Sequence, residues 1–369
     1  MPDARWLHPG AWWVWALGMA AAASRTTNPL LLLLLIAVAA IVVQARRPEE
    51  PWGRSFGFFV RLGIIVIVVR VAIQLLFGAA VGTTRLVDLP GVTLPVWMAG
   101  VRLGGDVMLE ALLMALYDGL RLATILICIG AANSLASPTR LLKSVPAALY
   151  ELGVSVVVAL TFAPQLVSDI DRLRTARRLR GRRTTGLRAI GSAAIPVLEG
   201  ALERSVTLAA AMDSRGYGRR GPLSASQRRT TSALLLGGLV AAAIGMFALV
   251  GSGSPAVLGL PLLLLGAAAA IGALVLAGRT RVRTRYRPDP WSLPEWCVAG
   301  SGVAVVAAFT IGSLVDPVGM QTPFDPPTWP GLPLPALAGM AIALLPAVAA
   351  PPLPQPASAP AHVREEVAA

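Results

Sequence analysis

The sequence predicts an all-α polytopic membrane protein, a bundle of about eight transmembrane helices with a cytosolic region of amphipathic helices. Of its 369 residues 55% are hydrophobic and 14% are charged, and the mean hydropathy is +0.68. Long apolar runs recur along the chain, and basic residues gather between them. Such a composition is too apolar for a soluble domain, and the length allows several membrane spans.

Eight apolar runs are the predicted transmembrane helices. They cover residues 11–24, 29–44, 57–80, 119–135, 233–251, 256–277, 296–315 and 334–350. The first run, "AWWVWALGMAAAAS", has two interpretations: a signal-peptide core with an Ala-x-Ala cleavage site, or a helix whose tryptophans anchor it at the membrane interface. We favour the anchor because three tryptophans stand together at the start of the run.

The arginines set the predicted orientation. With a cytoplasmic N-terminus, the basic residues at 46–54, 172–229 and 279–287 all fall inside, and the loop 81–91 falls outside, as the positive-inside rule requires. These assignments to the two sides of the membrane hold if residues 148–167 do not add a full crossing. We expect that stretch to lie in the interface or to dip into the membrane.

Four segments follow from this arrangement. They are N-terminal transmembrane helices at 1–135, a cytosolic or interfacial region at 136–232, C-terminal transmembrane helices at 233–350, and a disordered Ala/Pro-rich tail at 351–369. The second segment is the only sizeable predicted cytosolic structure.

The net charge of +13 does not favour a nucleic-acid partner, because the basic residues, nearly all arginines, sit between apolar runs. A metal site is not predicted either. The two cysteines, Cys128 and Cys297, lie in apolar segments, the two histidines, His8 and His362, lie near the termini, and no Cys/His cluster is present.

Two amphipathic helices are predicted in the 136–232 region. The first, at 164–181, carries Leu166, Ile170 and Leu173 at helical spacing, with Asp169/Arg172 and Asp171/Arg174 as predicted i,i+3 ion pairs. The second is expected to open at Pro196, a residue suited to a first helical turn. Its predicted face comprises Leu198, Leu202, Ser205, Ala209 and Met212.

Both helices end in the pattern Ala-x-x-x-Arg-Gly, in "ARRLRG" (176–181) and "AMDSRG" (211–216). The spacing places alanine one turn before arginine on the same face, and glycine can adopt the left-handed conformation that closes a helix. A single match is explained by ordinary helix capping. Two copies, each ending an amphipathic helix in the same region, favour a docking role for the arginines.

At these residues the sequence resembles the transmembrane T component of energy-coupling factor (ECF) transporters, the CbiQ/EcfT family, whose members carry two Ala-Arg-Gly motifs at the ends of cytosolic coupling helices. The positions that carry the resemblance are Ala176, Arg178, Arg180 and Gly181 in the first motif, and Ala211, Met212, Arg215 and Gly216 in the second. Leu179 and Ser214 replace the alanine that precedes Arg-Gly in the family.

The resemblance implies an energy-coupling subunit in the plasma membrane, with its coupling region in the cytoplasm. Two partner ABC-type ATPases would bind the coupling helices, and a small substrate-binding membrane (S) subunit would deliver a vitamin or a transition-metal ion such as cobalt. The chain has no phosphate-binding loop, so the partners would bind ATP and Mg, and this chain would hold no cofactor. Arg180 and Arg215 would anchor the ATPases.

The alternative is a self-sufficient secondary transporter or channel, which would use ionisable residues within the membrane. The candidates are Arg61, Arg70, Asp106, Glu110, Asp118 and Arg121. We expect the stretch 102–121, which holds four of them, to be amphipathic and to lie along the interface. An enzyme is not predicted, because the nearest acidic group, "DID" at 169–171, is explained by intrahelical ion pairs.

Overall fold

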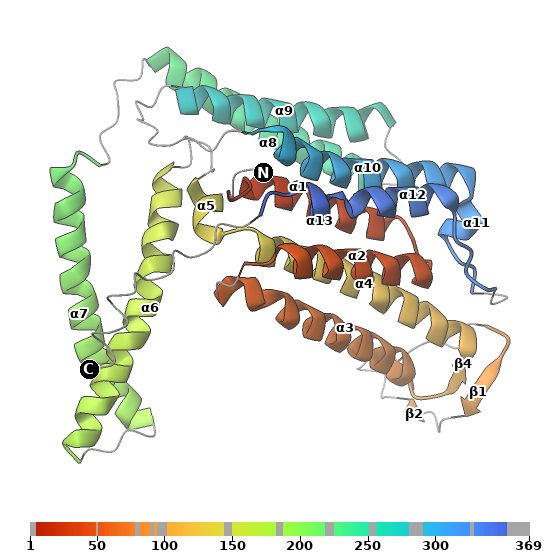
Figure 1. The fold of residues 1–369 in the computed structure, drawn as a ribbon, viewed down its shortest axis with the longest axis horizontal. Coiled ribbons are helices and arrows are strands. Elements are labelled where there is room, and N and C mark those ends of the chain that lie inside the picture. The colour runs from red at the N-terminus through yellow and green to blue at the C-terminus, as the bar shows by residue number, and fades with distance from the viewer. Residues whose placement is uncertain are drawn as a thin grey trace. The chain divides into compact units, whose positions relative to one another are not determined.

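The fold is that of a computed structural model and consists almost entirely of helices (Figure 1). The residues that the structure describes are 5–48, 51–77, 82–88, 92–93, 102–143, 150–181, 187–217, 225–250, 256–279, 291–324 and 328–352. They form two compact units, unit 1 (1–141 with 289–369) and unit 2 (142–288). The expected tail at 351–369 lies almost entirely outside the described residues.

Unit 1 contains the helices from both ends of the chain. They are α1 (Pro9–Ser24), α2 (Pro29–Arg46), the 3-10 turn η1 (Pro51–Arg54), α3 (Ser55–Phe77), α4 (Leu109–Leu135), α5 (Pro138–Lys143), which ends at the border of the unit, α10 (Leu293–Val315), α11 (Pro317–Met320), α12 (Leu334–Ala343) and α13 (Leu345–Ala349). Between α3 and α4 lie two antiparallel strand pairs, β1 (Arg85–Asp88) with β4 (Asp106–Met108), and β2 (Val92–Thr93) with β3 (Arg102–Leu103).

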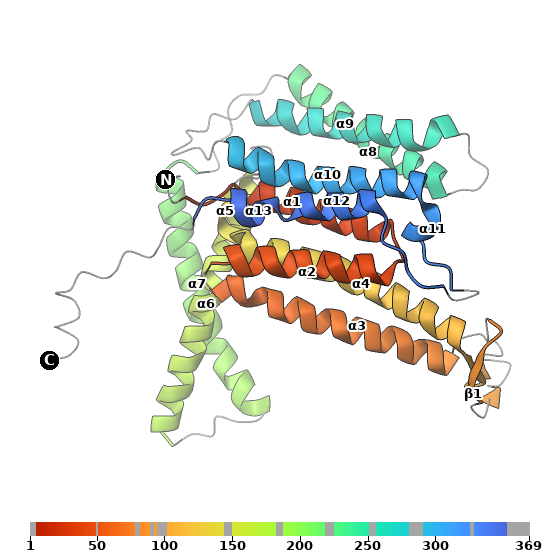
Figure 2. The ribbon, with the colours of Figure 1, turned by 45° about the vertical axis from the view of Figure 1, so that its right-hand side comes forward.

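Unit 2 contains four long helices, α6 (Tyr150–Leu179), α7 (Leu187–Ser214), α8 (Ala225–Val250) and α9 (Ala256–Arg279). α8 and α9 pack against each other along their length (Figure 2). Their backbones approach closely at glycines: a Cβ on Gly266 would lie 2.4 Å from the Ala242 amide nitrogen, and one on Gly245 would lie 2.5 Å from that of Leu263. Small residues at such contacts are typical of helix pairs in membranes.

The predicted fold class is confirmed. Seven of the described helices are long and apolar enough to cross a membrane, judged by length and composition: α2, α3, α4, α8, α9, α10, and α6 over Gly153–Leu179. Six of the eight predicted runs are among them. The runs at 11–24 and 334–350 form shorter helices, α1 and the pair α12–α13, and Pro346 lies in the first turn of α13.

The core of unit 1 forms where α1 crosses α10. A Cβ on Gly18 would lie 2.3 Å from the Gly302 carbonyl oxygen, and one on Gly302 would lie 2.5 Å from the Trp15 Cα. The absence of side chains therefore lets the two backbones touch. The C-terminal helices α10 and α12 thus pack into the same core as α1, α2 and α4.

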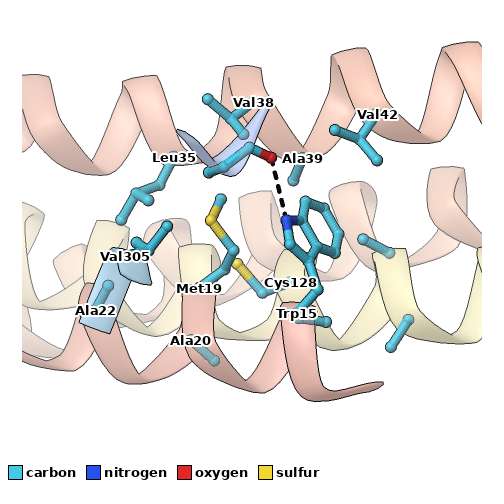
Figure 3. Packing of buried hydrophobic residues seen from close by; sticks show 14 of the residues in the cluster. Trp15, Met19, Ala20, Ala22, Leu35, Val38, Ala39, Val42, Cys128 and Val305 are labelled. Atoms are coloured by element: carbon cyan, nitrogen blue, oxygen red, sulfur yellow. Dashed lines mark hydrogen bonds between the residues drawn. The ribbon is translucent and has the colours of Figure 1, made fainter. Parts of the chain in front are cut away.

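The tryptophans of α1 are not interfacial anchors as a group, and that prediction was wrong for two of the three. Trp12 and Trp15 are buried, whereas Trp13 is half-buried. The Trp15 indole N–H donates a hydrogen bond of 3.1 Å to the Ala343 carbonyl at the end of α12 (Figure 3, dashed line). The ring is packed within the protein because a helix from the far end of the sequence covers it.

The turn between α1 and α2 is fixed by buried polar groups. The Asn28 Oδ1 accepts from the Leu30 and Leu31 amides and caps α2, while its Nδ2 donates to the carbonyls of Gly319 (2.7 Å) and Gly331 (2.6 Å). Asn28 is fully buried, and these bonds satisfy its amide. The turn is thereby tied to the segment around α11.

α4 begins ten residues earlier than the run at 119 predicted, because the acidic residues in its first half have partners. The buried Glu110 accepts from the Thr84 amide (3.0 Å) and the Thr83 hydroxyl (3.3 Å). Asp118 forms an ion pair of 3.1 Å with Arg70 of α3. Residues 109–121 are therefore part of the long helix α4, which packs against α3. They do not form the separate amphipathic helix at the interface that we expected over 102–121.

Candidate functional site

The first Arg-Gly motif ends α6, which is one continuous helix over Tyr150–Leu179. The sequence predicted two separate pieces here, an interfacial stretch and a helix that begins near Pro164. The structure instead carries the helix through Pro164, at the cost of one backbone hydrogen bond. The N-terminal half of α6 is apolar and the C-terminal half is charged, so the motif lies at the charged end.

At this end Gly181 adopts φ +65°, the left-handed conformation that the sequence predicted. Its amide donates to the Arg178 carbonyl (3.1 Å), and the Arg180 amide donates to the carbonyls of Ala176 (3.2 Å) and Arg177 (3.1 Å). Ala176, Arg178, Arg180 and Gly181 are all exposed. The Leu179 side chain is 85% exposed.

The second motif ends α7 in a complete Schellman motif. Gly216 adopts φ +75°, its amide donates to the Asp213 carbonyl (2.9 Å), and the Tyr217 amide donates to the Met212 carbonyl (3.0 Å). Ala211 and Arg215 are exposed, and Met212 and Gly216 are half-buried. The Ser214 hydroxyl donates to the Ala211 carbonyl (2.9 Å), so this replacement for the family alanine bonds back onto its own helix.

α7 begins earlier than predicted. It starts at Leu187, and Pro196 lies inside the helix, so the expectation that the helix opens at Pro196 was wrong. Nine residues of helix precede the proline because the chain there is rich in alanine and apolar residues that propagate a helix. The apolar stripe of α7 therefore includes Ile195.

That stripe is uncovered. Its members Ile195, Leu198, Leu202 and Val206 recur at helical spacing, and each is at least 60% exposed. Two of them, Leu198 and Leu202, were identified from the sequence. Ile195 and Val206 were not, although Ile195 lies three residues before Leu198 and Val206 lies four residues after Leu202, both helical spacings.

An ion pair joins α6 to α7. An Arg204 Nη2 contacts the Asp169 carboxylate, and the Arg204 Nε also donates to the Gly200 carbonyl (3.2 Å). The sequence paired Asp169 with Arg172 inside α6, so the link to α7 was missed. The predicted pair of Asp171 with Arg174 is present at 3.5 Å.

The two Arg-Gly ends point away from each other. α7 runs back past α6, so each helix carries its motif to the opposite end of the pair (Figures 1 and 2). Arg180 and Arg215 each follow the Asp169–Arg204 contact by eleven residues along their own helix. At 1.5 Å per residue, each arginine lies about 16 Å along its helix from that contact. The pair thus presents two matched, separated arginine-bearing ends.

The ionisable residues proposed for solitary transport do not meet in one place. Arg70 pairs with Asp118, Arg85 pairs with Asp106 at 2.5 Å, and Glu110 binds the backbone near Thr84. An Arg121 Nη2 donates to the Ser24 carbonyl at the end of α1, and Arg61 is exposed on α3. Among the described residues no three His, Cys, Asp or Glu side chains gather where they could hold a metal ion.

Comparison with known proteins points to one family. Residues 4–224, more than half of the chain and a range that includes both Arg-Gly ends, match the family model described as CbiQ, cobalt transport protein. The chain is also similar to the energy-coupling factor transporter transmembrane protein EcfT of Leuconostoc gelidum subsp. gasicomitatum. The two are 35% identical over 92 residues, which cover 23% of this chain and about a third (34%) of that protein.

Proposed function

The chain belongs to the CbiQ/EcfT family, the membrane components of ECF-type transporters, and from this premise we propose that it transmits the ATP-driven motion of partner ATPases through its two Arg-Gly helix ends. It is a multi-pass protein of the plasma membrane. The moving parts are α6 and α7, the coupling helices of this proposal. Their motion acts on a substrate-binding membrane subunit that delivers a vitamin or a transition-metal ion such as cobalt.

One observation carries the proposal: two exposed arginines end two helices in the same left-handed glycine cap, at opposite ends of a linked pair. Two separate ends suit two ATPase subunits, one at each. An arginine fork engages carboxylates or carbonyls in a groove, and a neighbouring alanine lets that surface approach closely. ATP and Mg are bound by the ATPases in this scheme.

The apolar stripe of α7 supports a second contact, with the substrate-binding membrane subunit. Arg204, which contacts α6, lies on the opposite side of the α7 helix from Leu198, Leu202 and Val206 at 100° per residue. α7 can therefore hold α6 on one side and an apolar partner surface on the other. Burial of such a stripe contributes about 25 cal/mol per Å² of apolar surface removed from contact with water.

The ATPase contact is tested by charge reversal at both helix ends, Arg180→Glu with Arg215→Glu. The tagged chain is purified from its native membranes in mild detergent, and ABC-type ATPases are quantified by mass spectrometry. Loss of a buried charge contact costs about 2–5 kcal/mol, so we expect recovery of the ATPases to fall at least about 30-fold. Arg172→Glu, an exposed position on α6 outside the motif, should leave recovery unchanged. Full recovery from the double variant overturns the coupling role.

The stripe is tested separately, with Leu198→Asp and Leu202→Asp together against Thr207→Asp, an exposed position off the stripe. We expect the stripe variant to lose the small membrane subunit while it keeps the ATPases, because the arginine ends are untouched. Equal loss of the membrane subunit from the Thr207→Asp control would contradict this assignment.

A further inference from the structure

An open cleft lies at one end of unit 1, and none of its lining residues belongs to the two Arg-Gly motifs. Its walls come from the segment before α1, the end of α2, the α4–α5 junction and the end of α13. Three of the lining residues are arginines, Arg5, Arg46 and Arg140, and none of the described lining residues is acidic. The cleft therefore favours an anionic ligand.

The protein holds the side chains of Arg46 and Arg5 in place. Arg46 donates to the Ala347 carbonyl through Nε (3.0 Å) and Nη2 (2.8 Å), and Arg5 contacts Glu295 through Nη2 (3.0 Å). A guanidinium has five N–H donors, so these bonds use some donors and leave others for a ligand. Fixed arginines lose little conformational entropy when they bind an oxyanion.

The cleft lies at the level where membrane-spanning helices end. Arg46 is the last residue of α2 and Leu135 is the last residue of α4, and both helices are long and apolar enough to span. Buried apolar residues, Trp12, Leu135 and Ala350 among them, line the same cleft. Basic groups beside an apolar wall at this depth match a lipid, whose charged headgroup meets its apolar chains at the membrane surface.

We propose that this cleft binds the phosphate headgroup of an anionic phospholipid, with the lipid's glycerol and first acyl carbons against the Trp12 side. Phosphate oxygens accept charge-assisted hydrogen bonds from arginine forks, which are stronger than bonds between neutral groups. The predicted orientation places this end in the cytoplasmic leaflet. A free phosphate ion would use the arginines and leave the apolar wall without a partner.

The test uses the full chain in detergent and native mass spectrometry, with phosphatidylglycerol, phosphatidylcholine and inorganic phosphate as separate probes. Phosphatidylglycerol should bind in preference to phosphatidylcholine. Arg140→Gln should weaken phosphatidylglycerol binding about fivefold, the effect of about 1 kcal/mol per basic residue at a membrane surface. Arg47→Gln removes the same charge from an exposed neighbour outside the cleft and should leave binding unchanged.

Three results would overturn the proposal. They are equal binding of both lipids, unchanged phosphatidylglycerol binding by Arg140→Gln, and displacement of the lipid by millimolar inorganic phosphate, which would make the cleft a site for the soluble ion. Arg140→Lys keeps the charge and should retain most of the affinity. If Arg140→Gln does not yield folded protein by size-exclusion chromatography, Arg5→Gln replaces it with the same expected loss.

Discussion

Unit 1 and the α6–α7 pair differ in how far their side chains are buried. Unit 1 buries large side chains such as Trp15, Phe309 and Leu35 completely, and its turns are satisfied by buried polar groups. In contrast, no described residue of α6 or α7 is buried. The first region is stabilised by its own contacts, whereas the second leaves apolar and charged side chains exposed. The difference fits the docking role that we propose for α6 and α7.

The strongest test of this contrast is Gly302→Val at the α1–α10 crossing. The new Cβ would lie 2.5 Å from the Trp15 Cα, a backbone atom that cannot rotate away. We expect a loss of about 3 kcal/mol or more in the free energy of unfolding, at the upper end for overpacked cores. Thermal unfolding in detergent, followed by tryptophan fluorescence, measures it.

Gly300→Val is the matched control, since a Cβ there meets nothing within 4 Å and the helix propensity changes equally. If both variants unfold at the same temperature, the α1–α10 contact does not stabilise unit 1. That result would contradict the view that unit 1 is stabilised by its own contacts.

A smaller effect is expected from Gly216→Ala at the end of α7. An alanine at φ +75° costs about 1 kcal/mol, so the Schellman cap should loosen locally while unit 1 stays unchanged. Hydrogen exchange at the Gly216 and Tyr217 amides, both bonded inside the cap, should speed up about fivefold, the factor that corresponds to that energy.

Gly191→Ala serves as the reference for this measurement, because Gly191 lies within α7 in open space. It should be neutral or slightly stabilising, since alanine favours a helix more than glycine does. A Gly216→Ala variant that shifts global unfolding would show that α7 contributes to the stability of the whole chain, against the contrast above.

The smallest energetic effect is expected at the Asp169–Arg204 pair. Its side chains are 25% and 39% exposed, so Asp169→Asn should cost less than about 1 kcal/mol. Its effect on the distance between the ends of α6 and α7 should be easier to detect than its effect on stability. Spin labels at positions 179 and 214, in a background with Cys297→Ser, should report a broader distance distribution once the link is lost. Asp171→Asn, which breaks a pair within α6, should leave that distribution unchanged.

The sequence predicted the features that depend on neighbouring residues. The glycine caps at Gly181 and Gly216 follow from local backbone preference, and the fold class follows from hydropathy. The errors at Asp118 and Trp15 share one cause, contacts between distant parts of the chain. Asp118 sits within a long helix because Arg70, 48 residues earlier, pairs with it. Trp15 is buried because Ala343 covers its indole.

The same limit applies to the candidate site. The two Arg-Gly ends were recognised from sequence, and their docking role stays a prediction. The relative arrangement of the two ends could not be predicted from the sequence, because Asp169 pairs with Arg204 of α7 and not with the nearer Arg172. Local spacing ranks the nearer partner first, and the packing of α6 on α7 decides otherwise.

The contact between α1 and α10 at Gly18 and Gly302 can form only late in biosynthesis, after α10 has been translated. Gly18 and Gly302 are separated by about 280 residues, which take roughly 15 to 60 s to translate at 5–20 residues per second. During that interval the Trp15 face of α1 has no α10 to cover it. We therefore expect the nascent chain to depend on lipid or on the insertion machinery to shelter its first helix until the last third emerges.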